Sequence, residues 1–430
     1  MRVHLMGAGG AGVSALARVF LARGDEVTGC DTRASAVTEE LEDAGVRILI
    51  GHDPEHVLFQ DLLVYSGAIT GSPELAAARG MGLTVLSRAE MLAKLINESD
   101  SIAVAGTAGK TTVTHMLGHI LITAGYDPTV LVGDGASARA GRSSWLVAET
   151  DESDGTLTLH HPRRAIVTNI ELDHPDHFPD VSAVRDLFQL FIANLPEDGL
   201  AVMCADDELV RQLTPKAQRI TYGFWHDATY RCEPVRPFPI YHGGHELGRI
   251  NLKQPGRHNI QNATAAAAMA LEIGVKLADV AAALESFPGA RRRMELLGVF
   301  QGATVYDDYA HHPTKVRATI EAARELRFRR LIVVFQPHRF SRLAAFMHDF
   351  SRAFEGADKV LVLDVYSAGE QNTSGVQASD LAHQMPNATY VGDFKTAREM
   401  LEELVGPGDL LLLMGAGDIN RLGDELAHRV

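Results

Sequence analysis

Short apolar runs alternate along the chain with longer segments rich in alanine and leucine. Each run has the length of a strand, and the longer segments repeat their apolar residues at helical spacing. The runs occupy residues 2–6, 101–105, 145–148, 165–169, 331–335, 359–364 and 410–414. Strands that alternate with helices are typical of βαβ units, so the pattern predicts an α/β protein built on parallel sheets.

Two turn-rich stretches divide this pattern into three parts. One lies at residues 97–100, just before a new strand, and the other at residues 287–290, where proline and glycine follow a helix. The length of 430 residues suits three domains of roughly 150 residues each. We therefore predict domains at residues 1–99, 100–288 and 289–430. Residues 221–252 are rich in Tyr, His, Pro and Gly and predict a β-meander within the middle domain.

The composition limits the cellular compartment in which we expect the protein and the kinds of partner that it can bind. Fifty-five acidic against 40 basic residues give a formal charge of −15, which disfavours binding to nucleic acid or to an anionic membrane. Three scattered cysteines are too few for a disulfide framework. No apolar run reaches the ~18 residues of a membrane span, and no apolar signal region opens the chain. We expect a cytoplasmic protein that is not inserted in a membrane; the oligomeric state stays open.

The first candidate binding loop is a glycine-rich turn between the strand at 2–6 and a helix at 13–23. It consists of Gly7, Ala8, Gly9, Gly10, Ala11 and Gly12. Such a turn lets the backbone approach a diphosphate, and the helix N-terminus favours its charge. Asp31 ends the next strand, where a ribose contact would lie. The motif predicts a dinucleotide-type fold but does not choose between NAD and another diphosphate such as a UDP-sugar, and a turn without ligand is the alternative.

The second loop has the form G-x-x-G-K-T-T, between the strand at 101–105 and a helix that runs to Thr123. It consists of Gly106, Thr107, Ala108, Gly109, Lys110, Thr111 and Thr112. In such a phosphate loop the backbone amides surround the phosphates, the lysine reaches the β/γ oxygens and the first threonine ligates Mg²⁺. The loop therefore predicts ATP binding.

Candidate metal ligands follow the next two strands. Glu149 comes directly after the strand at 145–148, where a carboxylate can hold a second Mg²⁺. We interpret Asp151, Glu152 and Asp154 as a solvated acidic turn. His174 follows the strand at 165–169 and is a candidate ligand of the same metal, although a lone histidine is more often structural.

A pair of asparagines opens the alanine-rich helix of the middle domain. Asn259 and Asn262 are three residues apart and therefore share a helical face, which suits an adenine edge. Helix capping by Asn259 explains the spacing equally well.

Four strand ends in the last third carry polar or small residues, at 307–313, 336–342, 364–366 and 415–418. Their convergence predicts a binding face for a second substrate, with Arg339 and Arg342 as a clamp for a carboxylate. Arg293 closes a run of three arginines that could reach a γ-phosphate; a solvated basic linker is the alternative.

Taken together, these motifs resemble the Mur ligases, the ATP-dependent amide-forming enzymes of peptidoglycan synthesis. The resemblance covers nearly the whole chain and rests on the order and spacing of eight segments: 7–12, 106–112, 169–174, 258–262, 307–313, 336–342, 364–370 and 415–419. It implies an N-terminal Rossmann-like domain that binds a UDP-sugar, a central P-loop ATPase-type domain and a C-terminal Rossmann-like domain that binds an amino acid. The implied reaction joins UDP-N-acetylmuramate to L-alanine with ATP and Mg²⁺.

The resemblance also implies roles for single residues. The UDP-sugar is held by the turn at 7–12 together with Asp31 and Ser66. ATP is bound by the loop at 106–112 and by Asn259, Asn262, Arg293 and Asp308. The Mg²⁺ ligands are Thr111, Glu149 and His174. The catalytic set is Lys110, Glu149, His174, Arg293 and His311. The amino acid is received by Tyr309, His338, Arg339 and Arg342.

Two positions bear on the branch of the family. Alanine-adding members usually have histidine where this chain has Ala108, so a contact made by that side chain is missing here. Other branches carry a modified lysine near residues 186–191, where this chain has Gln189 and no lysine. The second position favours the alanine-adding branch.

Four other readings compete with this one. An NAD-dependent dehydrogenase leaves the phosphate loop unexplained. A sister ligase that attaches a whole tripeptide to the same UDP-sugar shares most of the motifs and differs in the amino-acid pocket. A regulatory module would bind ATP without chemistry. Folate-type polyglutamate ligases share the ATPase core but lack the opening domain.

Overall fold

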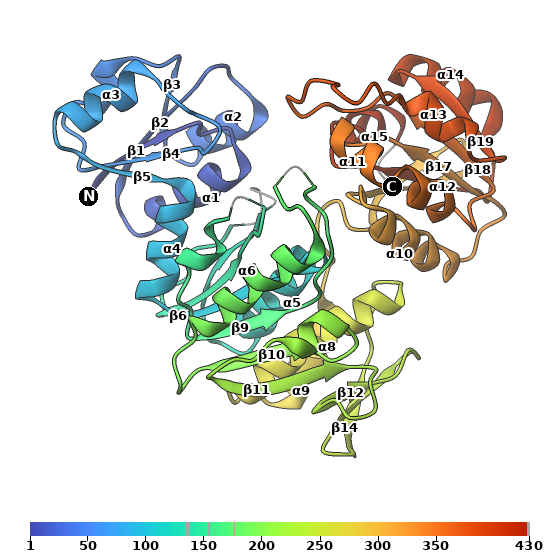
Figure 1. Cartoon of the computed structure of the whole chain (residues 1–430), viewed down its shortest axis with the longest axis horizontal. Coiled ribbons are helices and arrows are strands. Elements are labelled where there is room, and N and C mark those ends of the chain that lie inside the picture. Colours follow the sequence, from blue (N-terminus) through green and yellow to red (C-terminus); the bar gives the residue numbers. More distant parts are fainter. Residues whose placement is uncertain (134–137, 154, 176, 428–430) are drawn as a thin grey trace. The chain divides into compact units, whose positions relative to one another are not determined.

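The structure is a computed structural model that describes residues 1–133, 138–153, 155–175 and 177–427. Its strands form three separate sheets (Figure 1). Contacts between residues divide the chain into two compact units. The first unit contains Met1–Ile170, Ser182–Asn251 and Gln261–Phe287, and the second contains Glu171–Val181, Leu252–Ile260 and Pro288–Val430.

The N-terminal sheet has five parallel strands in the order β3-β2-β1-β4-β5. Its strands are β1 (Arg2–Met6), β2 (Glu26–Asp31), β3 (Arg47–Ile50), β4 (Leu62–Tyr65) and β5 (Thr84–Ser87). One face packs on α1 (Ala11–Ala22), α2 (Ala36–Asp43) and α4 (Arg88–Glu98). The other face packs on η1 (Pro54–Val57) and α3 (Pro73–Gly80). Helices on both faces of a parallel sheet make this region Rossmann-like, as predicted.

Helix α1 shows how the apolar pattern positions the glycine turn. Val13, Leu16 and Phe20 recur at helical spacing and are buried against the sheet. The helix begins at Ala11, two residues before the predicted start, so Gly12 lies in its first turn. Gly10 at the N-cap has no side chain that could cap the helix. The backbone amides at this end of the helix therefore remain available to a ligand, and the glycines let a ligand come close to them.

The central sheet has nine strands in the order β14-β13-β12-β11-β10-β9-β6-β8-β7. Its parallel part consists of β6 (Asp100–Ala105), β7 (Thr129–Leu131), β8 (Trp145–Glu149), β9 (Arg164–Val167), β10 (Leu200–Cys204) and β11 (Gln218–Gly223). The predicted meander is confirmed by the antiparallel pairs among β12 (Tyr230–Cys232), β13 (Phe238–His242) and β14 (His245–Ile250). The helices are α5 (Lys110–Thr123), η2 (Thr156–Leu159), α6 (Val181–Ala193), α7 (Glu208–Gln212), α8 (Arg257–Glu272) and α9 (Leu277–Ser286).

The C-terminal sheet has six strands in the order β15-β16-β20-β17-β18-β19. These are β15 (Glu295–Phe300), β16 (Ala303–Asp308), β17 (Leu331–Phe335), β18 (Lys359–Leu363), β19 (Ala388–Gly392) and β20 (Leu410–Met414). All pairs are parallel except β15 with β16, an antiparallel edge that the sequence pattern did not predict.

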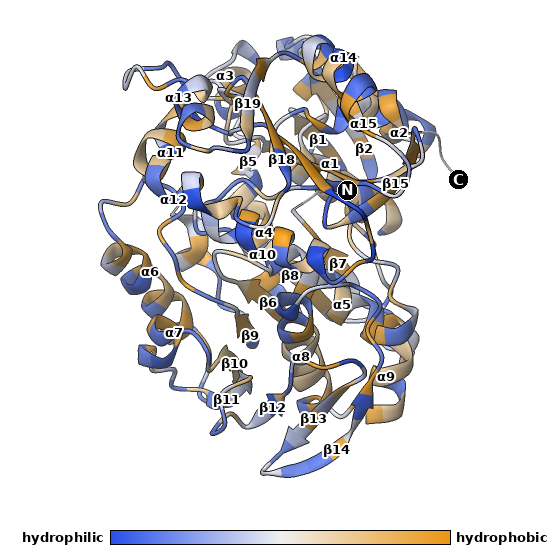
Figure 2. Ribbon diagram, turned by 90° about the vertical axis from the view of Figure 1, so that its right-hand side faces the viewer, coloured by the Kyte–Doolittle hydropathy of each residue, from blue (hydrophilic) through white to orange (hydrophobic). Residues whose placement is uncertain are grey.

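Two cores fill the faces of the C-terminal sheet. One lies under α10 (Pro313–Arg324), α11 (Phe340–Ala345), α12 (Met347–Ala353) and α13 (Ala378–His383). The other lies under α14 (Phe394–Leu404) and α15 (Asn420–Leu426). In Figure 2 the hydrophobic shade runs along strands of this sheet, whereas β14 in the middle domain is coloured as polar. Such all-apolar strands are expected where helices cover both faces of a sheet.

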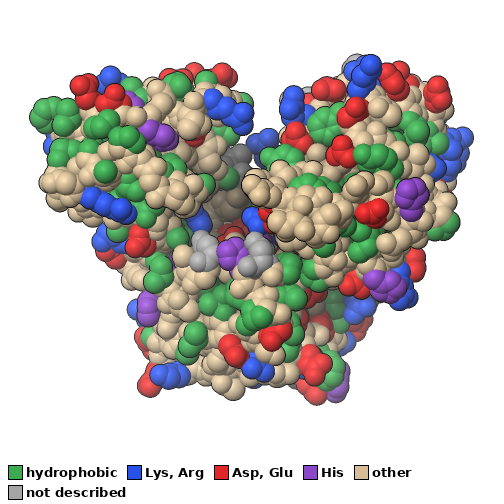
Figure 3. Space-filling model, turned by 45° about the horizontal axis from the view of Figure 1, so that its top comes forward, with side chains coloured by type: hydrophobic (Ala, Val, Ile, Leu, Met, Phe, Trp, Pro, Cys, Tyr) green, Lys and Arg blue, Asp and Glu red, His purple; other side chains and the backbone are tan. Residues whose placement is uncertain are grey.

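The surface matches the composition. Acidic and basic side chains are interspersed over the faces visible in Figure 3. Among the described residues, no helix is both long and apolar enough to span a bilayer.

Candidate active site

The phosphate loop joins β6 to α5, and the backbone at its two glycines excludes any other residue. Gly106 has φ +138° and Gly109 has φ +87°. A Cβ at Gly106 would lie 1.9 Å from Thr168 Oγ1, and one at Gly109 would lie 2.6 Å from Asn262 Oδ1. The loop is therefore packed against the end of β9 and against α8, with the N-terminus of α5 facing the concave side of the loop.

Asn169 holds the apex of the phosphate loop. Its Oδ1 accepts a hydrogen bond from Ala108 N at 2.8 Å, its Nδ2 donates to Ala108 O at 3.0 Å, and its own carbonyl accepts from Thr107 N. Thr168 Oγ1 also donates to Ala108 O, at 2.6 Å. These contacts explain why β9 ends at Val167, two residues before the predicted end. The sequence prediction missed Asn169 as a site residue, although it is the second residue after a strand that pairs with β6.

Lys110 and Glu152 form a buried ion pair beside the loop. Lys110 Nζ lies 2.5 Å from Glu152 Oε2 and 3.7 Å from Asp151 Oδ1. Desolvation alone would lower the pKa of Lys110, but the carboxylates of Glu152, Asp151 and Glu149 outweigh it and hold the pKa above its ordinary value. Burial raises the pKa of Glu152, and the ammonium of Lys110 opposes that rise. The prediction of a solvated acidic turn is thus wrong for Glu152, which is 2% exposed, because the loop lysine draws its carboxylate inward. Asp154, predicted to belong to the same turn, lies outside the described residues.

Thr111 and Glu149 bring a hydroxyl and a carboxylate together at the start of α5. Thr111 Oγ1 donates to the Glu149 carboxylate at 3.0 and 3.1 Å, and Gly133 N donates to the same carboxylate at 2.8 Å. Oxygen donors of this kind are the ligands that Mg²⁺ prefers. The two residues therefore fit the divalent cation that accompanies a bound nucleoside triphosphate.

The two asparagines lie inside α8, which begins at Arg257, so they share a helical face as their spacing predicted. Asn259 is the third residue of the helix and therefore not its N-cap, and its Nδ2 donates to Pro255 O at 2.7 Å. Asn262 lies against Gly109 of the phosphate loop.

The glycine turn at the N-terminus is shaped by Asp31. Its Oδ2 accepts a hydrogen bond from Gly9 N at 2.9 Å, while its Oδ1 accepts from Thr32 N. Gly7 has φ +77°, and a Cβ there would lie 2.9 Å from Ser66 Cβ. Gly12 abuts Arg88, whose Cδ would lie 2.3 Å from a Cβ at this position. The structure thus brings Asp31 and Ser66 to the same turn, as the resemblance implied.

In the second unit, Asp173 is the centre of a buried charge cluster. Its carboxylate lies 2.6 Å from Lys315 Nζ, 2.8 Å from Arg342 Nη2 and 3.9 Å from His311 Nε2. Despite its burial, the two cations hold the pKa of Asp173 well below its ordinary value. The sequence prediction passed over this residue for its neighbour His174, which lies in a turn where its carbonyl accepts from His177 N and Phe178 N.

His311 is kept neutral by its surroundings. Burial and the charges of Lys315 and Arg342 hold its pKa well below the ordinary value. Its Nδ1 lies 2.7 Å from Tyr309 O. Because a carbonyl oxygen can only accept, this contact places the proton of the neutral ring on Nδ1 and leaves the lone pair on Nε2, which can accept a proton.

Two arginine side chains lie close to the ring of Tyr309. The guanidinium carbons of Arg292 and Arg293 are 4.9 and 4.7 Å from its ring centroid. Arg292 is held by Asp307 at 3.1 Å and by the carbonyls of Gly415 and Gly417. Arg293 Nη1 donates a hydrogen bond to the carbonyl of Arg292 at 3.2 Å, which holds the two arginines at the same tyrosine ring.

Asp308 organises the backbone of the second unit. Its carboxylate accepts hydrogen bonds from Met294 N at 2.8 Å, Ala310 N at 2.9 Å and Thr319 Oγ1 at 3.1 Å. These three donors occupy both oxygens. The geometry supports a positioning role for Asp308 beside Tyr309 and His311.

The residues predicted to receive an amino acid meet around His338. Its ring stacks on Tyr366 with centroids 5.6 Å apart, and its Nδ1 lies 3.2 Å from Arg342 Nη1. Burial and the charges of Arg342 and Arg339 lower the pKa of His338 to about 4. Arg342 is 2% exposed and engaged by Asp173, whereas Arg339, with φ +67°, lies 3.5 Å from Glu370 and is the more exposed of the two. Of the two arginines predicted to bind the carboxylate of the amino acid, Arg339 is therefore the more accessible.

Comparison with known proteins identifies the family. The sequence matches three family models in succession: "Mur ligase family, catalytic domain" over residues 2–100, "Mur ligase middle domain" over residues 104–270, and "Mur ligase, glutamate ligase domain" over residues 292–417. The chain belongs to the Mur ligase family.

Relatives of this Mur ligase match over its full length. UDP-N-acetylmuramate–L-alanine ligase of Geotalea daltonii is 40% identical and covers 100% of this chain and 98% of its own. The ligase of the same name from Rubrobacter xylanophilus is 41% identical, with 100% of both chains covered. Among solved structures, UDP-N-acetylmuramate-alanine ligase of Thermotoga maritima superposes with a TM-score of 0.82 at 28% identity, covering 99% of this chain and 98% of that one. These matches confirm the predicted family and the three-domain α/β fold.

The two positions that bear on the branch of this Mur ligase, Ala108 and Gln189, both make hydrogen bonds to nearby residues. Ala108 contributes its backbone to the contacts with Asn169, so the loop keeps its shape without a longer side chain there. Gln189 on α6 bonds to Thr214, donating to its carbonyl at 3.2 Å and accepting from its amide at 3.0 Å. Gln189 therefore has a structural role in this chain.

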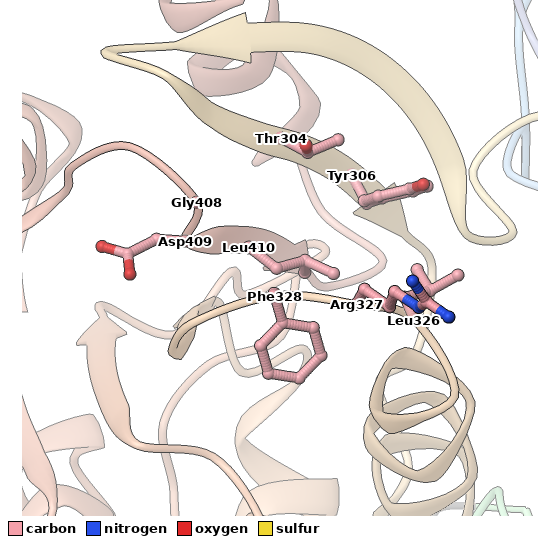
Figure 4. Close-up of a pocket in the computed structure, with 8 residues that line it drawn as sticks. All are labelled: Thr304, Tyr306, Leu326, Arg327, Phe328, Gly408, Asp409 and Leu410. Atoms are coloured by element: carbon pink, nitrogen blue, oxygen red, sulfur yellow. The ribbon is translucent and has the colours of Figure 1, made fainter.

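Two hollows lie within this Mur ligase, one in each unit. One, of about 40 Å³, is lined by residues of α1, Arg88, Gly133 and Glu149, so it connects the glycine turn with the candidate metal ligand inside the first unit. The other, of about 90 Å³, lies at the amino ends of β16 and β20 and is lined by Thr304, Tyr306 and Asp409 among others (Figure 4). Ligands of parallel α/β sheets bind at the carboxyl ends of the strands, so the second hollow lies on the wrong edge for the substrate.

Proposed function

We propose that this Mur ligase joins the muramyl carboxylate of UDP-N-acetylmuramate to the amino group of L-alanine, with cleavage of ATP to ADP and phosphate, in the synthesis of peptidoglycan precursors. The observation that carries the substrate assignment is the full-length similarity, at about 40% identity, to ligases of that name. The phosphate loop, with Thr111 Oγ1 at 3.0 Å from the Glu149 carboxylate, supports the use of a metal-bound nucleotide.

Each substrate is assigned to one predicted domain. UDP-N-acetylmuramate binds to residues 1–99 through the turn shaped by Asp31 and Ser66. ATP binds to residues 100–288, and L-alanine binds to residues 289–430. We place the reaction in the cytoplasm, which agrees with three cysteines that are not joined by disulfides.

The chain's own cations make the first chemical step feasible. A carboxylate oxygen of the muramyl group attacks the γ-phosphorus of ATP, the bond to the β-phosphate oxygen breaks, and ADP leaves an acyl phosphate. Two anions must approach each other in this step. Lys110 at the phosphate loop and Arg293 from the C-terminal domain neutralise the charge that repels them.

Mg²⁺ would be held by Thr111, Glu149 and His174, and it would add further neutralisation of the phosphate charge. Asn259 and Asn262 would face the adenine. Asp308 would position its neighbours Tyr309 and His311. Lys110 must exchange Glu152 for phosphate oxygens when ATP binds, because its ammonium is engaged by that carboxylate at 2.5 Å.

In the second step the alanine nitrogen attacks the acyl carbon, the bond from carbon to the phosphate oxygen breaks, and phosphate leaves. The nitrogen loses a proton to a base. His311 and His338 both have lowered pKa values and are neutral at pH 7, so either has a nitrogen able to take that proton. Arg339, with Tyr309 and Arg342, would orient the alanine carboxylate.

Product analysis separates this proposal from tripeptide recycling, the activity suggested by the fold match to a murein peptide ligase of Psychrobacter arcticus at 25% identity and TM-score 0.76. The enzyme is offered ATP, Mg²⁺ and UDP-N-acetylmuramate with equal amounts of L-alanine and the tripeptide. We expect a product that carries one alanyl residue. A product that carries the tripeptide instead would move the assignment to the recycling ligase.

An oxygen label tests the acyl phosphate. With ¹⁸O in the muramyl carboxylate, one labelled oxygen should appear in the released phosphate, because that oxygen bridges carbon and phosphorus in the intermediate. Unlabelled phosphate would exclude this route to the amide.

A further inference from the structure

Four side chains with metal-binding chemistry meet inside the N-terminal domain. They are His4 of β1, Cys30 of β2, His56 of η1 and Glu74 of α3. One ligand atom from each lies within 4.8 Å of the others. The chain brings them together from four separate elements on the sheet face that η1 and α3 cover.

The cluster is buried in an apolar setting. His4, Cys30 and Glu74 are 0% exposed, and the side chain of His56 is 15% exposed. Met6, Val57 and Leu75 belong to the core around them. A carboxylate and two imidazoles are costly in such a core unless each is paired or bound to a cation.

The contacts converge on Glu74. Its Oε1 lies 2.7 Å from His4 Nε2 and 3.2 Å from His56 Nδ1, and Cys30 Sγ lies 3.3 Å from its Oε2. In a tetrahedral zinc site with bonds of about 2.0–2.3 Å, neighbouring ligand atoms are roughly 3.3–3.8 Å apart. Shifts of about 1 Å, within reach of side-chain rotation, therefore convert the present contacts into that geometry.

Two further residues support the ligands from outside. Thr28 Oγ1 lies 2.7 Å from His4 Nδ1, on the neighbouring strand in register with His4. With the proton of His4 on Nδ1, this contact directs the Nε2 lone pair into the cluster, as the outer hydrogen bond does for zinc-bound histidines. His52 Nδ1 lies 2.9 Å from Glu74 Oε2, at the edge of the cluster.

We propose that His4, Cys30, His56 and Glu74 bind one Zn²⁺ as a structural site. A thiolate with two imidazoles favours zinc over the hard cations Mg²⁺ and Ca²⁺, so the site is chemically distinct from Thr111 and Glu149. The ion would join β1, β2, η1 and α3. Its position also matters for the glycine turn, because the carbonyl of Cys30 accepts hydrogen bonds from Gly7 N and Ala8 N. This inference does not depend on the proposed reaction.

The first test uses the full-length wild-type chain, stripped with a chelator and titrated with Zn²⁺ against a competing chelator in excess Mg²⁺. We expect one Zn²⁺ per chain. With Co²⁺ as probe, we expect the intense visible absorption of a tetrahedral site and a thiolate-to-metal charge-transfer band. A wild-type chain that takes up no Zn²⁺, or that gives a Co²⁺ spectrum without the thiolate band, would overturn the proposal.

Matched variants locate the ion. Cys30→Ser should abolish the thiolate band, whereas Cys232→Ser, which changes a buried thiol in the middle domain, should keep it. His56→Gln, at the more exposed ligand, should weaken Zn²⁺ binding at least about tenfold relative to His226→Gln on the surface. If Cys30→Ser does not fold, the Co²⁺ spectrum of the wild-type chain and the comparison of His56→Gln with His226→Gln still test the proposed zinc site. Equal Zn²⁺ affinity in His56→Gln and His226→Gln would refute this ligand set.

Discussion

Without ATP, the lysine of the phosphate loop, Lys110, forms an ion pair with the carboxylate of Glu152. The side chains are 12% and 3% exposed, so each charge depends on the other for compensation. Breaking such a pair leaves an unpaired buried charge, which costs about 3–5 kcal/mol when burial is complete.

Glu152→Gln is therefore expected to destabilise the free protein more than the ATP complex, because phosphate oxygens take over Lys110 in the complex. The measurement is the thermal unfolding midpoint with and without ATP and Mg²⁺. Asp151→Asn is the matched control, since this carboxylate is 48% exposed and lies 3.7 Å from the lysine; its effect should stay within about 1 kcal/mol. A Glu152→Gln protein as stable as wild type without ATP would contradict the account.

Lys110→Ala should abolish ATP turnover, because the loop then lacks the cation that stabilises the transferred phosphate. Removing one such group typically lowers kcat by about 10²–10³-fold. The rate of phosphate release measures the effect. Lys94→Ala, which removes a surface lysine paired with Glu98, should turn over ATP like wild type. Normal turnover by Lys110→Ala would refute the assignment of this loop.

Asp173→Asn should destabilise the second unit, because Arg342 and Lys315 would keep their charges without the buried carboxylate between them. We expect a loss of about 3–5 kcal/mol and a lower unfolding midpoint. Glu402→Gln, which breaks a surface pair with Arg398, should lose no more than about 1 kcal/mol. Equal midpoints for the two variants would show that the Asp173 cluster does not hold this unit together.

At the scale of single residues, sequence reasoning found the groups that belong to a motif and missed those defined by tertiary contact. Lys110, Thr111 and Glu149 follow from a loop and a strand end. Asn169 and Asp173 do not, because their roles arise from partners 61 and 169 positions away in the chain. Glu152 was mistaken for a solvated residue for the same reason.

At the scale of elements, two features require glycine in the phosphate loop. The backbone there has a positive φ, and neighbouring side chains leave no room for a Cβ. Gly109→Ala would place a methyl group 2.6 Å from Asn262 Oδ1 in addition to its strain at φ +87°. Gly125→Ala, just after α5, has nearly the same φ of +83° but nothing within 4 Å of the added carbon.

Both substitutions should therefore lower the free energy of unfolding by roughly 1–2 kcal/mol, because each places an alanine in the left-handed region. Gly109→Ala alone should also lower the affinity for ATP. Thermal unfolding gives the first effect and equilibrium binding of ATP the second. Equal ATP affinity in the two variants would show that the contact with Asn262 does not shape the loop.

Apolar runs predicted several strands to the residue, as in β1, β17 and β20, because strands covered on both faces have sharp hydrophobic ends. Helix starts were less predictable. Helix α1 begins at Ala11, two residues before its predicted start, because Ala11 and Gly12 carry no apolar signal of their own. The residues of β15 are apolar enough for a strand, but nothing in them predicts antiparallel pairing at the edge of the sheet.

At the scale of the whole molecule, the fold class and the order of the three sheets follow from the alternation of strands and helices. The ligand of the first domain does not, since a glycine turn after a strand serves NAD and UDP-sugars alike. The resemblance across eight segments favours a UDP-sugar, and the names of the full-length relatives agree with that choice.

The measurement that tests the central claim most directly is phosphate release from ATP and Mg²⁺, with UDP-N-acetylmuramate and each amino acid supplied singly and together. Phosphate should appear in quantity only when UDP-N-acetylmuramate and L-alanine are both present. Release that needs a peptide in place of alanine would contradict the acceptor. A chain that binds ATP but releases no phosphate with any acceptor would contradict the assignment of a ligase.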